Sequence, residues 1–309
     1  MATVRTAWDQ VSANTFKTWL IMFFFSLFTV GVIYILAMGF GYGQGSGLSL
    51  VGMALIFAGL MNFASYYWSD KIVLAVSGAK PISENSNKEL YRTVENLCIA
   101  AGLPTPKIYT IDDSATNAFA TGRDPKHAAI CFTTGILQKL NKQELEGVTA
   151  HELSHVGNRD TLLMGVVSVL VGMIAVLSDW FLRSMFWGGR GRDNEGKNNT
   201  IFMVLALASA ILAPLVATLI QLAVSRRREL LADASGVLLT RYPEGLINAL
   251  LKISKDKEPL EAANRGTAHL YIVNPFKGAQ AGAFLAGLFN THPSIEVRVK
   301  ALREMEGKI

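Results

Sequence analysis

Long uncharged apolar stretches alternate with mixed polar segments along this chain, and the alternation predicts its layout. No charged residue occurs between Lys17 and Asp70, and a glycine-rich turn divides this stretch in two. We interpret the two parts as helices, Thr18–Phe40 and Leu48–Trp68, because each is near the roughly 20 residues that cross a bilayer core. The pattern therefore predicts a transmembrane hairpin over residues 1–69.

Two further apolar stretches predict a second transmembrane hairpin over residues 161–225. Thr161–Ser178 carries no charge, and we predict that it directly continues the helix before it. Asn198–Ser225 is long enough to span with tilt. Residues Leu270–Thr291 are also mostly apolar, but an Asn-Pro pair and recurring glycines interrupt them. We interpret that stretch as a buried or membrane-skimming segment, which leaves about four transmembrane helices.

Between the hairpins, residues 70–160 have the pattern of a water-exposed α+β segment. Ser86–Ala101 has helical periodicity, while Lys107–Ile111 and His127–Thr133 are rich in β-branched and aromatic residues and predict strands. A helix is expected to begin at Asn141, because this possible N-cap is followed three residues later by a glutamate, as in a capping box.

Residues 226–309 form a second segment of the same kind. Helices are expected at Glu229–Thr240 and Pro243–Lys255, and a last helix begins at Ser294. The pattern therefore predicts an α-helical integral membrane protein with an α+β domain built from these two segments.

Composition and charge agree with a membrane protein and exclude several classes. Half of the residues are hydrophobic (50%) and only 17% are charged, while a net charge of +5 is too small and dispersed for nucleic-acid binding. Cys98 and Cys131 are too few for a disulfide framework and lack metal-ligand spacing. The first apolar stretch is longer than a signal-peptide core, so we expect an uncleaved anchor.

The strongest chemical signal is His-Glu-Leu-Ser-His at residues 151–155, on a predicted helix. The i, i+4 spacing places His151 and His155 on one face, where both imidazoles can bind one Zn²⁺. Glu152 between them can serve as general base for the attacking water. A chance match within an ordinary polar helix is the alternative, and it is the weaker one because the motif falls on a helix.

A catalytic zinc site needs a third protein ligand, and Glu229 is the best remaining donor. If the two apolar stretches before it form an antiparallel hairpin, His155 and Glu229 emerge on the same side of the membrane. Asp233, one helical turn after Glu229, can accept a hydrogen bond from a ligand histidine and fix its tautomer. The alternative is a helix with two solvated acidic residues.

Taken together, the motifs resemble those of HtpX-type membrane metallopeptidases, the group that includes the CAAX prenyl endopeptidases. The matching pieces are the N-terminal apolar hairpin and the sequences NAFATG, HELSHVGNRD, RRRELLAD and THPSIEVR. The resemblance implies a zinc peptidase of a bacterial-type inner membrane that faces the cytoplasm and takes part in membrane-protein quality control. It also implies Glu229 as third ligand and Asp233 as its partner. Ser294 stands where the family usually has a second proline.

The same resemblance implies roles for two residues near the C-terminus. Related peptidases place a histidine and an arginine from this region near the scissile carbonyl, and His292 and Arg298 fit that pattern. The alternative is a helix-entry histidine and a surface arginine. His127 and His269 are expected to be structural rather than ligands.

A candidate substrate-binding segment precedes the zinc helix. Small residues Ala118 and Ala120 alternate with Asn117 and Phe119, as in a strand with one crowded and one open face. Such an edge strand can hold an extended substrate through main-chain hydrogen bonds, and the family resemblance favours this over an ordinary loop or inner strand.

The fold class that we predict is an α-helical integral membrane protein with a zincin-like α+β catalytic domain and about four transmembrane helices. The function that we predict is zinc-dependent hydrolysis of peptide bonds in unfolded or misfolded membrane proteins, next to the lipid bilayer. Three alternatives stay open: an intramembrane site-2-type protease, a prenyl-protein CAAX endopeptidase, and an inactive membrane adaptor. Lys71 and Arg226–Arg228 favour a cytoplasmic active site, whereas the basic loop Arg183–Asn199 conflicts with a second hairpin that crosses completely.

Overall fold

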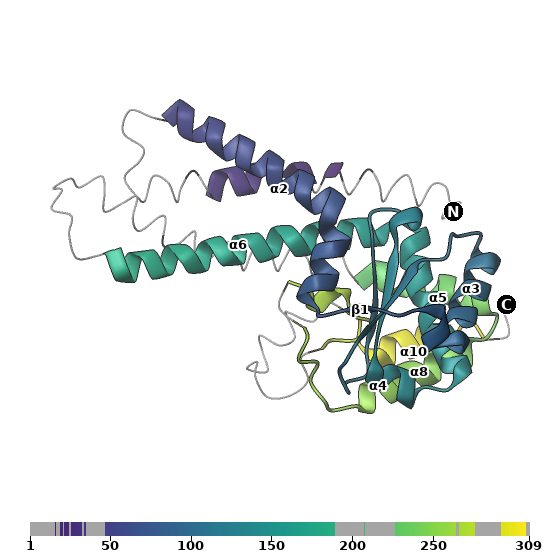
Figure 1. Ribbon diagram of the computed structural model, residues 1–309. Helices are drawn as coiled ribbons and strands as arrows, with labels where there is room; N and C mark the ends of the chain where they lie inside the picture. The colour runs from purple at the N-terminus through teal and green to yellow at the C-terminus, as the bar shows by residue number, and fades with distance from the viewer. Residues whose placement is uncertain are drawn as a thin grey trace.

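The computed structural model describes a rounded body from which two long helices project (Figure 1). The described residues are 47–188, 226–263, 266–275 and 292–306, with scattered positions between residues 16 and 34 and residue 207. Part of the first predicted spanning segment, all of the fourth except Leu207, and residues 276–291 lie outside them.

A four-stranded mixed sheet crosses the body. The order across the sheet is β1 (Lys80–Pro81), β2 (Lys107–Ile111), β4 (Ala129–Thr133) and β3 (Ala118–Thr121). β2 and β4 are parallel, while β1 and β3 run antiparallel to their neighbours. β3 therefore forms one edge of the sheet, and it contains most of the segment for which we expect an edge strand.

Four helices pack with one face of the sheet around the main hydrophobic core. They are α3 (Lys88–Ala101), α5 (Lys142–Gly157), α8 (Pro243–Lys255) and α10 (Ile295–Arg303). Their buried apolar residues meet the sheet residues Ile108, Ala118, Ala120, Ile130 and Phe132. This is the face on which the predicted zinc helix lies.

A second hydrophobic cluster involves the opposite side chains of the sheet and the base of the long helices. Phe119 of β3 and Cys131 of β4 pack there with Val73 and with Tyr271, whose ring makes an edge contact with Phe119. Both faces of β3 are therefore buried, and the open face that we expected beside Ala118 and Ala120 is not present.

Short elements connect the larger ones. They are η1 (Glu84–Ser86), η2 (Pro125–His127), α4 (Thr134–Lys139) and η3 (Ala268–Leu270). Residues 226–240 are helical as well.

The two long helices are α2 (Gly47–Val76) and α6 (Asp160–Gly188), which pack along one another (Figure 1). α2 continues without interruption through residue 69, so the boundary that we expected there falls inside a helix. Within the described residues no single helix has the length and hydropathy required of a membrane span. One bent pair meets those criteria jointly, Lys142–Gly157 with Asp160–Met173.

The junction between α5 and α6 differs from the sequence-based expectation of one continuous helix. The two axes meet at 82°, and Arg159 between them has φ +61°. A left-handed residue cannot continue an α-helix, so α5 ends here and α6 starts in a new direction. The prediction of continuity was wrong because apolar periodicity carries no information about a single backbone conformation.

Local signals at helix ends are confirmed. Asn141 caps α5 through the N–H of Glu144, whose side chain accepts from the Asn141 N–H, so both bonds of the capping box form. Asn87 caps α3 and Ser294 caps α10, while α8 has proline in its first turn.

Candidate active site

The centre of the site lies on α5, where His151 and His155 occupy one face. Their ring centroids are 4.8 Å apart and their Nε2 atoms are 3.3 Å apart. Both side chains are buried. The helix is held close to α8, because a Cβ added at Gly147 would lie 2.6 Å from the backbone N of Leu246. The two imidazoles thus have a fixed position inside the body.

Residues 226–240 bring a carboxylate to the histidines. Glu229, Asp233 and Gly236 follow one another at helical spacing, so they share one face of this helix. A Cβ at Gly236 would lie 2.9 Å from the backbone N of His151. The absence of a side chain there lets the helix contact α5 directly, and this places Glu229 over the imidazoles.

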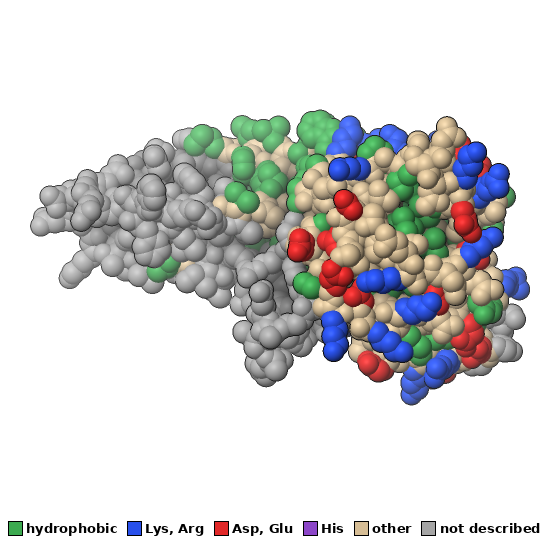
Figure 2. Space-filling model, turned by 60° about the horizontal axis from the view of Figure 1, so that its bottom comes forward, with side chains coloured by type: hydrophobic (Ala, Val, Ile, Leu, Met, Phe, Trp, Pro, Cys, Tyr) green, Lys and Arg blue, Asp and Glu red, His purple; other side chains and the backbone are tan. Residues whose placement is uncertain are grey.

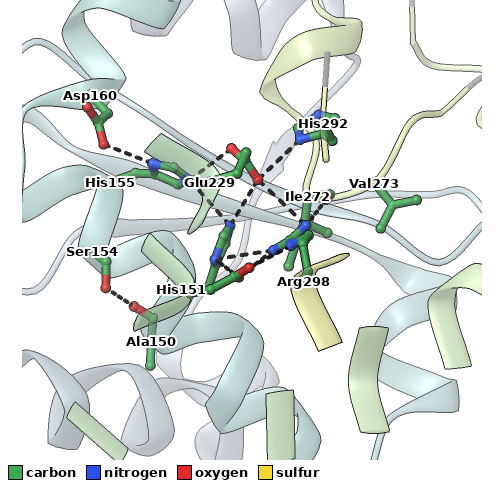
Figure 3. A network of polar contacts seen from close by, with 12 residues as sticks. Ala150, His151, Ser154, His155, Asp160, Glu229, Ile272, Val273, His292 and Arg298 are labelled. Carbon is green, nitrogen blue, oxygen red and sulfur yellow. Dashed lines mark hydrogen bonds and ion pairs between the residues drawn. The ribbon is translucent and has the colours of Figure 1, made fainter. Parts of the chain in front are cut away.

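The three side chains form a compact donor set (Figure 3). Glu229 Oε2 lies 3.6 Å from His151 Nε2, and Glu229 Oε1 lies 3.4 Å from His155 Nε2. One donor atom from each residue lies within 4.8 Å of the others. Two nitrogens and one carboxylate oxygen, all buried and facing one point, match the donors that a divalent transition metal takes in catalytic sites.

In both histidines a carboxylate lies next to Nδ1, which leaves Nε2 free to bind a metal. His151 Nδ1 lies 2.9 Å from Asp233 Oδ1, and His155 Nδ1 lies 3.1 Å from Asp160 Oδ2. A carboxylate on Nδ1 fixes the tautomer in which Nε2 carries the lone pair. The structure therefore places Asp233 beside His151, and it adds Asp160, which the sequence reasoning did not assign.

Each of these carboxylates lies next to an arginine. Arg298 is completely buried and donates two hydrogen bonds to Asp233, from Nε at 2.8 Å and from Nη2 at 2.6 Å. Its Nη1 donates to the Ile272 carbonyl at 2.8 Å. Arg228 Nε lies 3.6 Å from Asp160 Oδ1. The two histidines thus have similar surroundings built from different parts of the chain.

Glu152 is buried and follows His151 directly in α5. Within the described residues its Oε1 is buried without a hydrogen-bond partner. Burial raises the pKa of Glu152, while the charges of His151 and His155 act in the opposite direction. A raised pKa makes this carboxylate a better proton acceptor than an exposed glutamate.

The neighbouring imidazoles have the reverse effect on Glu229. Burial tends to raise its pKa, but His292 and the two histidines of α5 together hold the pKa of this carboxyl well below its usual range. For His155, burial lowers the pKa, and the carboxylates of Asp160 and Glu229 raise it further than burial lowers it. A metal that binds here must therefore displace a proton from the histidines.

The remaining candidates from the sequence lie in or near this cluster. His292 is buried and its Nδ1 lies 3.1 Å from Glu229 Oε2 (Figure 3). Arg298 contacts Asp233 as described, with its Nη1 3.6 Å from Glu229 Oε2. The structure thus brings His292 and Arg298 to the same carboxylate, although 147 residues separate Arg298 from His151.

The proposed substrate segment lies along the same cluster. Asn117 is buried, and its Nδ2 donates to the Val273 carbonyl at 3.0 Å. The side chains of Ala118 and Ala120 lie in the main core, and Phe119 lies in the second one. All four residues are buried as whole residues, main chain included, so the structure shows no open edge at this segment.

Comparison with known proteins identifies the family of this chain. The model of peptidase family M48 matches residues 84–306. A protease HtpX homolog of Dictyoglomus thermophilum is 45% identical over 300 residues, covering 97% of this chain and 95% of that protein. One from Pyrococcus furiosus is 43% identical over 291 residues, covering 94% and 95%. The chain belongs to peptidase family M48.

A solved structure agrees at the level of the fold. The crystal structure of S. mikatae Ste24p matches this M48 peptidase with a TM-score of 0.50 at 22% identity, covering 93% of this chain and 66% of that one. Family membership and the full-length match to HtpX proteases identify a membrane-associated metalloprotease. The predicted class of enzyme is thus confirmed, whereas the identity of the metal and of the substrates belongs to the proposal below.

Two residues of this M48 peptidase escaped the sequence reasoning. Asp160 follows His155 by five residues, and the sequence reasoning takes it only as the end of the water-exposed segment 70–160. Its acidic side chain next to a zinc-binding sequence was the available signal. Arg228 was interpreted only as a topology signal, and no pattern in the sequence indicated its contact with Asp160.

The other histidines do not join the donor set. His127 is exposed and contacts Asp124 and Arg123. His269 is buried with its Nε2 3.0 Å from Ser168 Oγ, and burial lowers its pKa to about 4. Both positions agree with the structural role that we predict for them.

Proposed function

We propose that this M48 peptidase is a membrane-anchored zinc endopeptidase that hydrolyses peptide bonds of unfolded or misfolded membrane proteins. The observation that carries the proposal is the convergence of His151, His155 and Glu229, all buried, with Glu152 next to them. Two imidazoles and one carboxylate are the protein ligands of a familiar class of catalytic zinc sites. Asp233 and Asp160 orient the two imidazoles.

The mechanism follows from the roles that each side chain can take. A bound Zn²⁺ supplies polarisation of a carbonyl oxygen and a lowered pKa of water. Glu152 accepts a proton from the attacking water and passes it to the leaving amine. His292 can donate a hydrogen bond to the oxygen on which negative charge develops. Arg298, held by Asp233, keeps the carboxylate under His151 in place.

Exposed apolar side chains support membrane anchoring. Along α2, Ile56 is 67% exposed, Leu60 63% and Phe63 54%. Figure 2 shows such side chains gathered beside the grey region, while charged side chains are distributed over the rounded body. Large contiguous apolar surface is rare on water-exposed protein and marks contact with a membrane or partner. We therefore propose hairpins over residues 1–69 and 161–225, and catalytic segments over 70–160 and 226–309.

The proposed location is a bacterial-type inner membrane with the active site in the cytoplasm. Thiol labelling of Gly196→Cys tests the second hairpin, since residue 196 lies in the connection between its two halves. Cys98 and Cys131 are both buried and provide a low background. We expect labelling from the outer side only, and labelling from the cytoplasmic side alone would show that the hairpin does not cross.

The catalytic proposal is tested with purified protein. We expect one zinc per chain by elemental analysis and cleavage of an unfolded polypeptide that stops when a chelator removes the metal. Glu152→Gln should keep the zinc and abolish cleavage, because the ligands survive and the general base is lost. Turnover at the wild-type rate in this variant would contradict the mechanism.

A further inference from the structure

The exposed apolar side chains of α2 lead to a group of aromatic residues beside the rounded body. Tyr67 follows Phe63 by about one turn, and the centroids of the two rings are 4.6 Å apart. Tyr66 stacks on Trp19 with ring centroids 5.8 Å apart, so Trp19 lies at the same level. Tyr67 and Trp68 are both exposed. Tyrosine and tryptophan are typical of the boundary between hydrocarbon and headgroups, so this group marks the level of a membrane surface.

Arg123 lies over the ring of Tyr67 at this level. Its guanidinium carbon is 5.3 Å from the ring centroid, the distance of a cation–π contact. Arg123 belongs to the turn that joins β3 and β4, in which Lys126 is exposed as well. Figure 2 shows Lys and Arg side chains directly beside the apolar ones, where the projecting helices meet the rounded body. The turn thus offers positive charge at the level where phospholipid headgroups lie.

The turn holds one edge of the guanidinium. Arg123 Nε lies 3.4 Å from Asp124 Oδ2, and Arg123 Nη2 donates to His127 Nε2 at 2.9 Å. Because arginine can only donate, His127 carries its proton on Nδ1, which lies 2.8 Å from Asp124 Oδ1. The same carboxylate accepts from the main-chain N–H groups of Lys126 and His127. Asp124 is therefore committed to the shape of the turn.

The opposite edge of the guanidinium is open. Within the part of the chain that the structure describes, Arg123 Nη1 has no hydrogen-bond acceptor. Tyr67 supports the planar group from one face and the turn holds it along one edge, so its free N–H groups keep a fixed direction. A fixed fork of N–H groups matches two oxygens of a phosphate. The contacts around Arg123 therefore form a site for one phosphate before any ligand binds.

We propose that this turn binds the phosphate of an anionic phospholipid such as phosphatidylglycerol, with Arg123 as the donor and Tyr67 as the ring that orients it. The inference rests on the membrane anchoring in the proposed function and names the lipid chemistry that the anchored protein recognises. The acyl chains lie against the exposed apolar side chains of α2. Phosphatidylcholine binds more weakly, because its own ammonium group balances the phosphate charge.

A lipid at this site also fixes the depth of the donor set. The Gly122 carbonyl, next to Arg123 in the chain, accepts a hydrogen bond from the hydroxyl of Thr161 at 2.7 Å. Thr161 follows Asp160, whose Oδ2 lies 3.1 Å from His155 Nδ1. Two short contacts and the intervening backbone thus connect the headgroup site with a histidine of the donor set. Peptide bonds close to the membrane surface are then the ones within reach.

Native mass spectrometry of the purified full-length protein, released from a neutral detergent, tests the inference. Phosphatidylglycerol or phosphatidylcholine with identical acyl chains is added, and the dissociation constant of the first bound lipid is determined. We expect phosphatidylglycerol to bind about tenfold more tightly, the effect of one hydrogen bond to a charged group. Equal binding of the two lipids would overturn the inference. Inorganic phosphate is the probe for a soluble anion, and its retention by the wild type but not by Arg123→Gln would overturn it as well.

Two pairs of variants locate the site. Arg123→Gln should lose the preference for phosphatidylglycerol, whereas Arg92→Gln, at an exposed position of α3, should retain it. Tyr67→Leu should lower the preference about threefold and Tyr67→Phe should keep it, because the phenyl ring still supports the guanidinium. Circular dichroism checks the fold of all four. An unchanged preference in a folded Arg123→Gln contradicts the inference, and should that variant not fold, equal preferences in the two Tyr67 variants contradict it.

The same measurements separate this inference from the proposed function. Lipid binding needs neither zinc nor turnover, so a protein that prefers phosphatidylglycerol but cleaves no peptide would reject the catalytic proposal alone. A protein that is absent from the membrane fraction would reject the anchoring and the lipid site together. An anchored, active protein that binds both lipids equally would reject the lipid site alone.

Discussion

The surroundings of His151 and of His155 are chemically alike, but different parts of the chain supply them. Each imidazole has a carboxylate on Nδ1 and an arginine behind that carboxylate. Around His151 both partners come from the distant C-terminal segment, and the arginine forms a bidentate pair at 2.8 and 2.6 Å. Around His155 the carboxylate is five residues away, and its arginine lies at 3.6 Å.

The difference between the two carboxylate–arginine contacts indicates which carboxylate needs the stronger tertiary contact to hold it in place. Asp160 stands at the start of a helix directly after the bend, so short-range backbone geometry already places it. Asp233 belongs to a helix that only tertiary packing brings to α5, and Arg298 ties it to α10 and to the Ile272 carbonyl. The carboxylate that only tertiary packing places, Asp233, therefore has the stronger ion pair.

The largest expected effect on zinc binding and activity is that of removing Glu229, the ligand that joins the helix of residues 226–240 to the histidines of α5. Glu229→Ala should lose zinc and all activity, because it removes one of three protein ligands. His292→Ala should keep the zinc and lower the rate about 10²–10³-fold, the effect of losing one donor to a developing oxyanion. Elemental analysis and peptide hydrolysis measure both quantities. Equal zinc loss in the two variants would mean that the ligand set is wrong.

The two arginines should differ in their effect on stability. Arg298→Met leaves Asp233 buried without its cation and should cost about 3–5 kcal/mol in the free energy of unfolding. Arg228→Met removes a longer contact at 3.6 Å and should cost about 1 kcal/mol. Chemical denaturation in detergent compares them, and similar losses would contradict the proposed difference in rigidity.

The two carboxylates should have more similar effects on the metal. Asp233→Asn and Asp160→Asn each keep the shape of the side chain and remove the negative charge behind an imidazole. Each should lower zinc affinity about 10–100-fold. Competition with a chelator measures the affinities. If only one variant binds zinc more weakly, the other carboxylate does not orient its histidine.

A smaller effect on zinc affinity is expected at the contact between the helix of residues 226–240 and α5. Gly236→Ala places a methyl group 2.9 Å from the backbone N of His151, and it should shift the helix of Glu229 by a few tenths of an ångström. We expect zinc affinity about tenfold lower with an unchanged rate for the fully loaded enzyme. Leu238→Ala serves as a control, because Leu238 lies on the same helix and is 56% exposed.

The sequence predicts those parts of this molecule that depend on short-range rules. The i, i+4 pair His151 and His155 and the capping box at Asn141 are confirmed as geometry, since neighbouring residues alone determine them. Helix α8 begins and ends at the predicted residues, Pro243 and Lys255, because its apolar period is strong.

Features that depend on one backbone angle or on tertiary contacts could not be predicted. The left-handed Arg159 ends α5 and turns Asp160 towards His155, but nothing in its residue type requires that conformation. The contact of Ile272 with Ala118 joins segments whose proximity only the complete fold creates. For the same reason Asn117 fits a strand pattern while its side chain is committed to Val273.

The separation of 147 residues between His151 and Arg298 also has a meaning during biosynthesis. A ribosome completes the zinc helix long before Glu229, Asp233 and Arg298 exist, so the nascent chain holds two histidines and a base without their third ligand. The donor set of His151, His155 and Glu229 therefore stays incomplete until the C-terminal segment has been synthesised.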